Sequence, residues 1–157
     1  MIHIYCGDGK GKTTAAMGLT VRAVGHGRRV AVAQFLKSGK SGEREIPANL
    51  PGVELLPIPE EMKFTFLMTP EEKAAEAVRQ KDIAAQAFAR SSKVDLLVLD
   101  ELCAALSTGM LELPWVLEQL DACPKALEVV ITGRNPPPEL EERAAYITEM
   151  KKHKHPF

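Results

Sequence analysis

A glycine-rich turn between an apolar run and a helix constrains the fold of this chain more than any other feature. The apolar run is IHIYC at 2–6, the turn is GDGKGK, and an alanine-rich helix is expected over 13–24. A strand, a turn of this kind and a helix, in that order, direct backbone N–H groups and a helix N-terminus at one anion. The sequence therefore predicts a phosphate-binding loop after a first strand.

The loop is one residue shorter than the usual phosphate loop. Counting back from Gly11, Lys12 and Thr13 puts Cys6, instead of Gly7, at the first glycine of the pattern GxxxxGK[ST]. The glycines permit positive φ angles and close approach of oxygen atoms. The lysine is expected to offset phosphate charge, and the threonine hydroxyl to ligate Mg²⁺.

Short apolar runs alternate with helical stretches along the rest of the chain. This alternation is typical of an α/β fold in which a mostly parallel sheet has helices on both faces. With 157 residues, no repeat and no linker, the chain is predicted to form one domain over 1–157. The runs expected to form strands are 2–6, 29–36, 53–58, 94–100, 126–132 and 145–150.

Capping signals mark the helix that follows the third run. Thr69, Pro70 and Glu72 supply an N-cap, a proline at the first helical position and a capping-box glutamate. Further helices are expected from near 114 to before 124 and, briefly, from 139. The capped helix is expected to run to about residue 90, with one apolar face formed by Ala74, Ala77, Val78, Ala84, Ala85 and Phe88.

Composition argues against several classes of partner. The net charge is -1 with acidic and basic residues nearly balanced, so nothing favours nucleic acid or a membrane surface. Cys6, Cys103 and Cys123 are odd in number and include no CxxC pair, which is typical of reduced thiols. No apolar run approaches the ~20 residues of a membrane span. We therefore expect a cytoplasmic protein that binds neither nucleic acid nor membrane.

A pair of acidic residues follows a strongly apolar run. Asp100 and Glu101 end the sequence LLVLDE, and at least one of them is expected at the carboxyl edge of the sheet, beside the phosphate loop. A nucleotide site of this type needs such a group to hold its metal, directly or through water. A pair of surface acids at a helix start is the less favoured alternative.

Two arginines and two phenylalanines are weaker candidates. Arg22 lies nine residues after Thr13 and is placed to reach a phosphate, although a helical arginine is more often solvated. Arg134 follows a buried run and is expected at the ligand edge. Phe64 and Phe66 alternate with polar residues, which fits a flat apolar ligand. Without further information, the more favoured interpretation of the two phenylalanines is ordinary packing in the core.

These elements together make the sequence similar to the ATP:corrinoid adenosyltransferases that also act on cobyrinic acid a,c-diamide. That family has a short loop of the form GxGKGKTTAA, matched here by GDGKGKTTAA at 7–16. The resemblance covers almost the whole chain, with Asp8 where Asn is frequent and Phe66 where Trp is frequent. Further matches are GERE at 42–45, KFTF at 63–66, LVLDEL at 97–102 and VVITGRNPPPEL at 129–140.

The resemblance implies a RecA-like P-loop fold and transfer of the 5′-deoxyadenosyl group of ATP to Co(I) of a corrinoid, with release of triphosphate. In that family the short loop holds ATP in reverse, with the γ-phosphate where other P-loop proteins place the α-phosphate, so the 5′-carbon is open to attack. The residues that it implies as the triphosphate cradle are Gly7, Asp8, Gly9, Lys10, Gly11, Lys12, Thr13 and Thr14.

The resemblance also implies roles for residues outside the loop. Thr13 with Asp100 or Glu101 is expected to hold Mg²⁺, and Arg22 to join the phosphate contacts. Lys12 is expected to stabilise the departing triphosphate.

On the corrinoid side, the same resemblance implies that Phe64 and Phe66 displace the lower axial ligand of Co(II), which makes reduction to Co(I) easier. An external reductant, such as a flavoprotein, and a homodimeric state are implied as well.

Two other functions fit parts of the sequence. A P-loop kinase or ATPase directs attack at the γ-phosphate and yields ADP without a corrinoid. A non-catalytic module binds ATP or a corrinoid and yields no triphosphate. The short loop speaks against the first of these alternatives.

Overall fold

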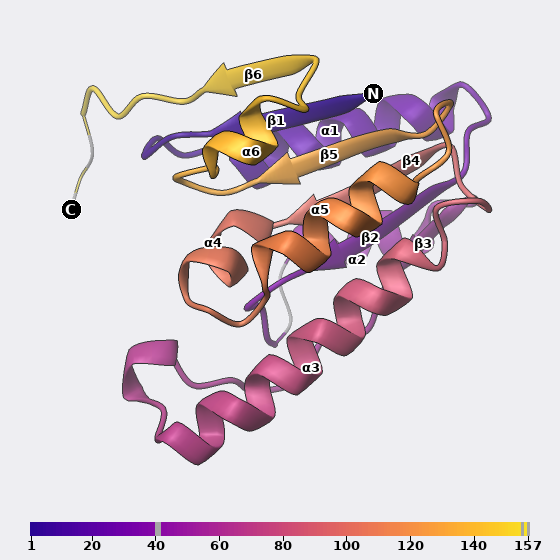
Figure 1. Cartoon of the computed structure of the whole chain (residues 1–157). Helices are drawn as coiled ribbons and strands as arrows, with labels where there is room; N and C mark the ends of the chain where they lie inside the picture. The colour runs from indigo at the N-terminus through magenta and orange to yellow at the C-terminus, as the bar shows by residue number, and fades with distance from the viewer. Residues whose placement is uncertain (40–41, 155, 157) are drawn as a thin grey trace.

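A six-stranded sheet forms the centre of the molecule. The computed structural model describes residues 1–39, 42–154 and 156. The strand order is β3-β2-β4-β5-β1-β6, and every pairing among these described strands is parallel (Figure 1). The predicted α/β fold with a parallel sheet is confirmed. The strands are β1 Ile2–Cys6, β2 Val30–Gln34, β3 Val53–Leu55, β4 Leu96–Asp100, β5 Glu128–Thr132 and β6 Tyr146–Glu149.

Helices cover both faces of the sheet, as the sequence predicts. In Figure 1, α3 and α5 lie in front of the sheet and α1 lies behind it. The predicted helices at 13–24, 70–90, 114–123 and 139 are present, whereas α2, α4 and the short 3-10 turn η1 were not predicted. The helices are α1 Lys12–Gly25, α2 Gly42–Asn49, η1 Thr65–Leu67, α3 Pro70–Phe88, α4 Leu102–Ser107, α5 Leu113–Ala122 and α6 Pro138–Glu141.

Side chains of the central strands alternate between two apolar cores. Leu97 and Leu99 of β4 join the larger core with residues of α3, α4 and α5. Leu96 and Val98 join the smaller core with residues of α1. This alternation follows from the two-residue period of a strand, and burial on both faces explains why the strand sequences are almost wholly apolar.

The capping box of α3 is confirmed, but its predicted apolar face is partly wrong. Thr69 accepts from the N–H of Glu72, and the Glu72 side chain accepts from the N–H of Thr69. Ala74, Val78 and Ala85 are exposed. Glu76 and Gln80 are polar, yet both are buried on this face. Their burial is compensated by hydrogen bonds, because Gln80 donates to Glu76 and accepts from a backbone N–H. The buried residues are Glu76, Gln80, Ile83, Ala84, Ala87 and Phe88.

The order of the strands brings the loops of the predicted site together. The strand before the phosphate loop, β1, is separated from the strand that ends in Asp100, β4, by one inserted strand, β5. Because all three run in the same direction, their carboxyl ends meet at one edge of the sheet. No helix of the described chain is long and apolar enough to cross a bilayer.

Candidate active site

The phosphate loop connects β1 to α1 and ends in a left-handed glycine. Gly11 is the N-cap of α1, with a φ of 108° and no side-chain cap. The first N–H groups of any helix lack intrahelical acceptors, and a terminus of this kind binds anions. The Lys12 side chain is buried, and its Nζ donates to the carbonyl oxygens of Gly7 and Gly9, each over 2.8 Å. The lysine therefore holds its charge inside the curve of the loop.

Three other side chains of the loop are open to solvent. Lys10 and Thr14 are exposed. The carboxylate of Asp8 is exposed too and accepts a hydrogen bond from the backbone N–H of Lys152 over 3.0 Å. That hydrogen bond lowers the pKa of Asp8 below its usual value.

Asp100 lies beside the start of α1, as the sequence predicts. Its carboxylate is 1% exposed and accepts from the Thr13 hydroxyl, over 2.9 Å at Oδ1 and 3.2 Å at Oδ2. The Thr132 hydroxyl, at the end of β5, also donates to Oδ1, over 2.7 Å. Thr132 accepts in turn from the backbone N–H of Glu101 over 2.8 Å. The start of α1 and the carboxyl ends of β4 and β5 are therefore joined through one buried carboxylate.

A second group of side chains holds Asp100 from the side of β2. Gln34, the last residue of β2, is 1% exposed, and its Nε2 donates to Asp100 Oδ2 over 3.1 Å. The guanidinium of Arg44, from α2, donates to Gln34 Oε1 and to the carbonyl oxygen of Leu56, the latter over 2.9 Å. Because Arg44 occupies the amide oxygen, the amide nitrogen of Gln34 is the atom left to face Asp100.

Glu101 adjoins the same edge in a strained backbone conformation. Its φ is 60°, an uncommon value for a residue with a side chain, and it is the N-cap of α4. Burial, and after it the negative charge of Asp100, raises the pKa of the Glu101 carboxyl, while the charges of Lys12 and Arg134 act in the opposite sense. Asp100 and Glu101 thus differ, the first fully hydrogen-bonded and the second half-buried at the mouth of the site.

Arg134 lies next to the phosphate loop, as expected. Its carbonyl oxygen accepts from the N–H of Gly7 over 3.1 Å. The exposed side chain lines a cavity of about 540 Å³ together with Cys6, Gly7 and Asp8. This cavity opens at the carboxyl edge of the sheet, where the nucleotide site was predicted.

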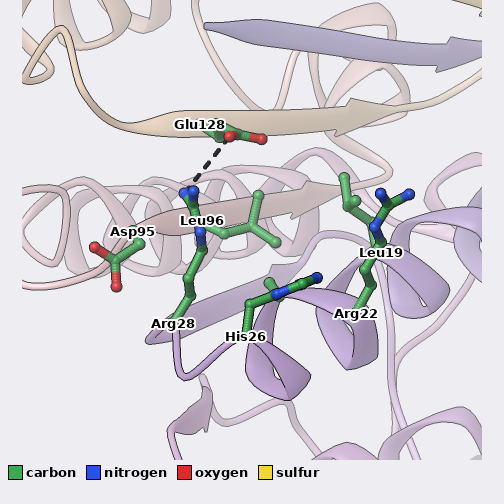
Figure 2. A pocket seen from close by; sticks show the side chains of 8 residues that line it. Leu19, Arg22, His26, Arg28, Asp95, Leu96 and Glu128 are labelled. Atoms are coloured by element: carbon green, nitrogen blue, oxygen red, sulfur yellow. Dashed lines mark ion pairs between the residues drawn. The ribbon is translucent and has the colours of Figure 1, made fainter.

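Arg22 is the predicted site residue that the structure does not bring to the loop. It is exposed on the last turns of α1, and the helical rise puts it ~14 Å along the axis from Thr13. Figure 2 shows it in a different pocket, which Arg28, Asp95 and Glu128 also line. These three residues lie at the starts of strands, so this pocket opens at the amino edge, opposite the phosphate loop.

Phe64 and Phe66 are both exposed, so the core packing that their sequence alone favoured is wrong. Phe64 is the N-cap of η1 and Phe66 lies within it, and the two residues are 69% and 76% exposed. The two rings stack at a centroid separation of 5.5 Å. Leu67 beside them is 62% exposed. Figure 1 shows η1 at the end of α3 that projects from the body of the molecule. The result is an apolar surface displayed toward solvent.

Sequence reasoning missed three residues of the network around Asp100. Gln34 and Thr132 are each the last residue of an otherwise apolar strand, and a polar residue at the carboxyl end of a buried strand is a usable signal. Arg44 lies in the GERE motif, but no local pattern indicates that its guanidinium reaches Gln34.

Comparisons with known proteins match the chain to one family along its whole length. The chain matches the family described as ATP:corrinoid adenosyltransferase BtuR/CobO/CobP over residues 1–157. It is 39% identical over 159 residues to a corrinoid adenosyltransferase of Pseudomonas aeruginosa, covering 100% of this chain and 77% of that protein. It is 35% identical over 158 residues to the corrinoid adenosyltransferase of Escherichia coli K12, covering 100% of this chain and 79% of that protein.

A third relative gives the same result. The chain is 33% identical over 160 residues to the corrinoid adenosyltransferase CobA of Salmonella typhimurium, covering 100% of this chain and 79% of that protein. With a match along its whole length, the short phosphate loop and the carboxylate beside it, the chain belongs to the ATP:corrinoid adenosyltransferase family, enzymes that transfer the adenosyl group of ATP to Co(I) of a corrinoid.

Proposed function

We propose that the carboxyl edge of the sheet binds ATP in the reversed orientation, with its triphosphate on the loop from Gly7 to Thr14 and its 5′-carbon open to Co(I). The observation that carries this placement is the hydrogen bond of Thr13 to the buried Asp100, because it joins a phosphate-loop hydroxyl to a carboxylate at the same edge. The loop amides, the N-terminus of α1 and Lys12 supply the positive electrostatic surroundings that a triphosphate requires.

The residues at this edge fit Mg²⁺. Mg²⁺ prefers oxygen ligands and is usually held by one or two carboxylates together with substrate phosphates and water. Thr13 and Asp100 offer a hydroxyl and a carboxylate within 2.9 Å of each other, with Glu101 next in the chain. The described residues contain no group of three or more His, Cys, Asp or Glu side chains that suits a metal held by protein alone. Bound there, Mg²⁺ supplies charge that offsets the phosphates.

The reaction that follows needs positioning more than proton transfer. A bond forms between cobalt and C5′, the bond from C5′ to the phosphate oxygen breaks, and the electron pair leaves with the triphosphate. Co(I) carries no proton to remove, so no base is needed at the nucleophile. Lys12, Lys10 and the loop amides stabilise the charge that develops on the departing oxygen. Alignment of cobalt, carbon and the leaving oxygen lowers the entropic barrier.

The exposed aromatic pair serves the corrinoid in this proposal. Phe64 and Phe66 present two stacked rings to solvent. An exposed apolar surface of this kind marks a binding site for an apolar ligand or partner. Placed under the corrin, such a surface excludes the lower axial ligand of Co(II), and cobalt without that donor is easier to reduce. An external reductant such as a flavoprotein then supplies the electron. We further propose a homodimer acting in the cytoplasm, where the three free cysteines stay reduced.

One anaerobic assay tests the proposal. The protein is incubated with ATP, Mg²⁺ and chemically reduced Co(I) corrinoid. A light-sensitive Co–C spectrum together with inorganic triphosphate is the expected result. ADP formed without corrinoid identifies a kinase or ATPase instead, and ATP binding without either product identifies a non-catalytic module.

A further inference from the structure

The segment that follows β6 runs along the phosphate loop. Figure 1 shows the chain leaving β6 at the side of the sheet where the turn between β1 and α1 lies. The N–H of Met150 donates to the carbonyl oxygen of Cys6 over 2.8 Å, and the N–H of Gly9 donates to the carbonyl oxygen of Met150 over 2.7 Å. We call residues 150–152 the C-terminal strap. The strap therefore continues the pairing of β6 with β1 beyond the end of the strand and onto the loop.

The fit between loop and strap leaves no room for a side chain. A Cβ atom on Gly7 would lie 2.4 Å from the carbonyl oxygen of Met150, and one on Gly9 would lie 2.6 Å from it. Real Cβ atoms essentially never approach another heavy atom to within 3.0 Å. Two of the loop glycines are thus required by the strap, in addition to any close approach of phosphate oxygen atoms.

A hydrogen bond to the Asp8 side chain also joins the strap to the loop. The Asp8 carboxylate accepts the backbone N–H of Lys152 over 3.0 Å, across 144 residues of chain. This hydrogen bond is the largest cause of the lowered pKa of Asp8. The side chain of Asp8 therefore faces the strap and joins the loop to it.

We propose that Asp8 and the C-terminal strap are positioning elements of the nucleotide site, which hold the phosphate loop in the shape that receives the triphosphate. The proposal rests on the proposed function, because it assigns the loop to triphosphate. A loop rich in glycine loses much conformational freedom when it binds, and contacts that order it beforehand reduce that cost. The N–H of Gly9 is bonded to Met150, so the phosphates are bound by the later amides of the loop and by Lys12.

The test measures nucleotide binding without corrinoid. The Kd for Mg²⁺-ATP is determined by calorimetry for the full chain and for Asp8→Ala and Asp8→Asn. Asp8→Ala is expected to raise the Kd ~3- to 10-fold, because an exposed charge-assisted hydrogen bond is partly screened by water. Asp8→Asn keeps the accepting oxygen and is expected to restore most of the affinity.

The same hydrogen bond is tested by substitutions of Lys152, which supplies the donating N–H. Lys152→Pro removes the donating N–H, whereas Lys152→Ala removes only the side-chain charge and is expected to weaken binding less. In a double-mutant cycle, Asp8→Ala and Lys152→Pro are expected to be non-additive, since each breaks the same bond. The rate of hydrogen exchange in the peptide that contains the loop is expected to rise in Asp8→Ala and in Lys152→Pro. The Kd for the corrinoid is expected to stay unchanged in both.

Failure of the proposed function and failure of the strap proposal give different results. Lack of Mg²⁺-ATP binding by the unaltered chain overturns the proposed function, and the strap proposal with it. Binding by the unaltered chain, with equal or tighter binding and unchanged loop exchange in Asp8→Ala and Lys152→Pro, overturns the strap proposal alone.

Discussion

The Thr13 hydroxyl donates to Asp100 Oδ1 over 2.9 Å, although 87 residues of chain separate the two. The contact exists because β1 and β4 run in the same direction on either side of β5, so that a helix start and a strand end meet at one edge. Asp100 is 1% exposed, and the hydrogen bonds of Thr13, Gln34 and Thr132 compensate for its desolvation. The position of the carboxylate therefore depends on those donors.

Replacement of Lys12 by alanine is expected to lower kcat by about 10²–10³-fold, the usual cost of a lost electrostatic contact to a leaving group. The buried Lys12 Nζ lies within the loop, bonded to Gly7 O and Gly9 O. The anaerobic Co(I) assay measures the effect. Lys10→Ala is the matched control, with a smaller loss, because Lys10 is exposed. Unchanged turnover in Lys12→Ala contradicts the assigned role.

Replacement of Thr132 by valine is expected to reduce both stability and metal affinity. Valine has the shape of threonine but leaves the N–H of Glu101 without its acceptor and removes one of the donors to Asp100. The free energy of unfolding, measured in urea, should fall by about 1–3 kcal/mol. The Mg²⁺ concentration for half-maximal activity should rise. Thr132→Ser retains the hydroxyl and should resemble the unaltered protein in metal response; equal effects of the two substitutions argue against the hydroxyl as the cause.

Replacement of Gln34 by methionine is expected to weaken the proposed Mg²⁺ site, because it disturbs the orientation of Asp100. Methionine fills the volume but lacks the N–H that bonds to Asp100 Oδ2. Gln80→Met is the matched control, since Gln80 is a fully buried amide whose hydrogen bonds, among the described residues, do not involve Asp100. Both variants should lose stability, and only Gln34→Met should need more Mg²⁺ for half-maximal ATP binding. A parallel rise in both variants indicates general destabilisation instead.

Replacement of Phe66 by alanine is expected to separate reduction from transfer. The reaction that starts from Co(II) and a reductant should slow at least several-fold, while the reaction from prereduced Co(I) should be less affected. The melting temperature should stay nearly constant because the residue is 76% exposed. Val78→Ala, at a side chain that is 72% exposed on α3, is the control for loss of an exposed apolar group. Equal losses from Co(II) and from Co(I) rule out a role in reduction.

Local signals in the sequence were sufficient for the six strands, for helices α1, α3, α5 and α6, and for the phosphate loop. The capping box at Thr69 and the glycine turn before Lys12 each act through atoms a few residues apart, so their effect is present in any context. The apolar strand runs predicted the parallel sheet for a similar reason, because burial on both faces removes the alternation of polar residues. Asp100 was found by the same route, as the polar end of an apolar run.

The tertiary structure alone decided which side chains meet. Gln34 and Arg44 act on Asp100 from β2 and α2, and Lys152 bonds to Asp8 from the opposite end of the chain. Conversely, Arg22 follows Thr13 by only nine residues, yet the rise of α1 carries it to the far edge of the sheet. The sequence by itself determined where turns and helix caps form and which runs become buried strands, because these features depend on residues a few positions apart. The order of the strands determined the site, because contacts between distant residues exist only once the sheet has assembled.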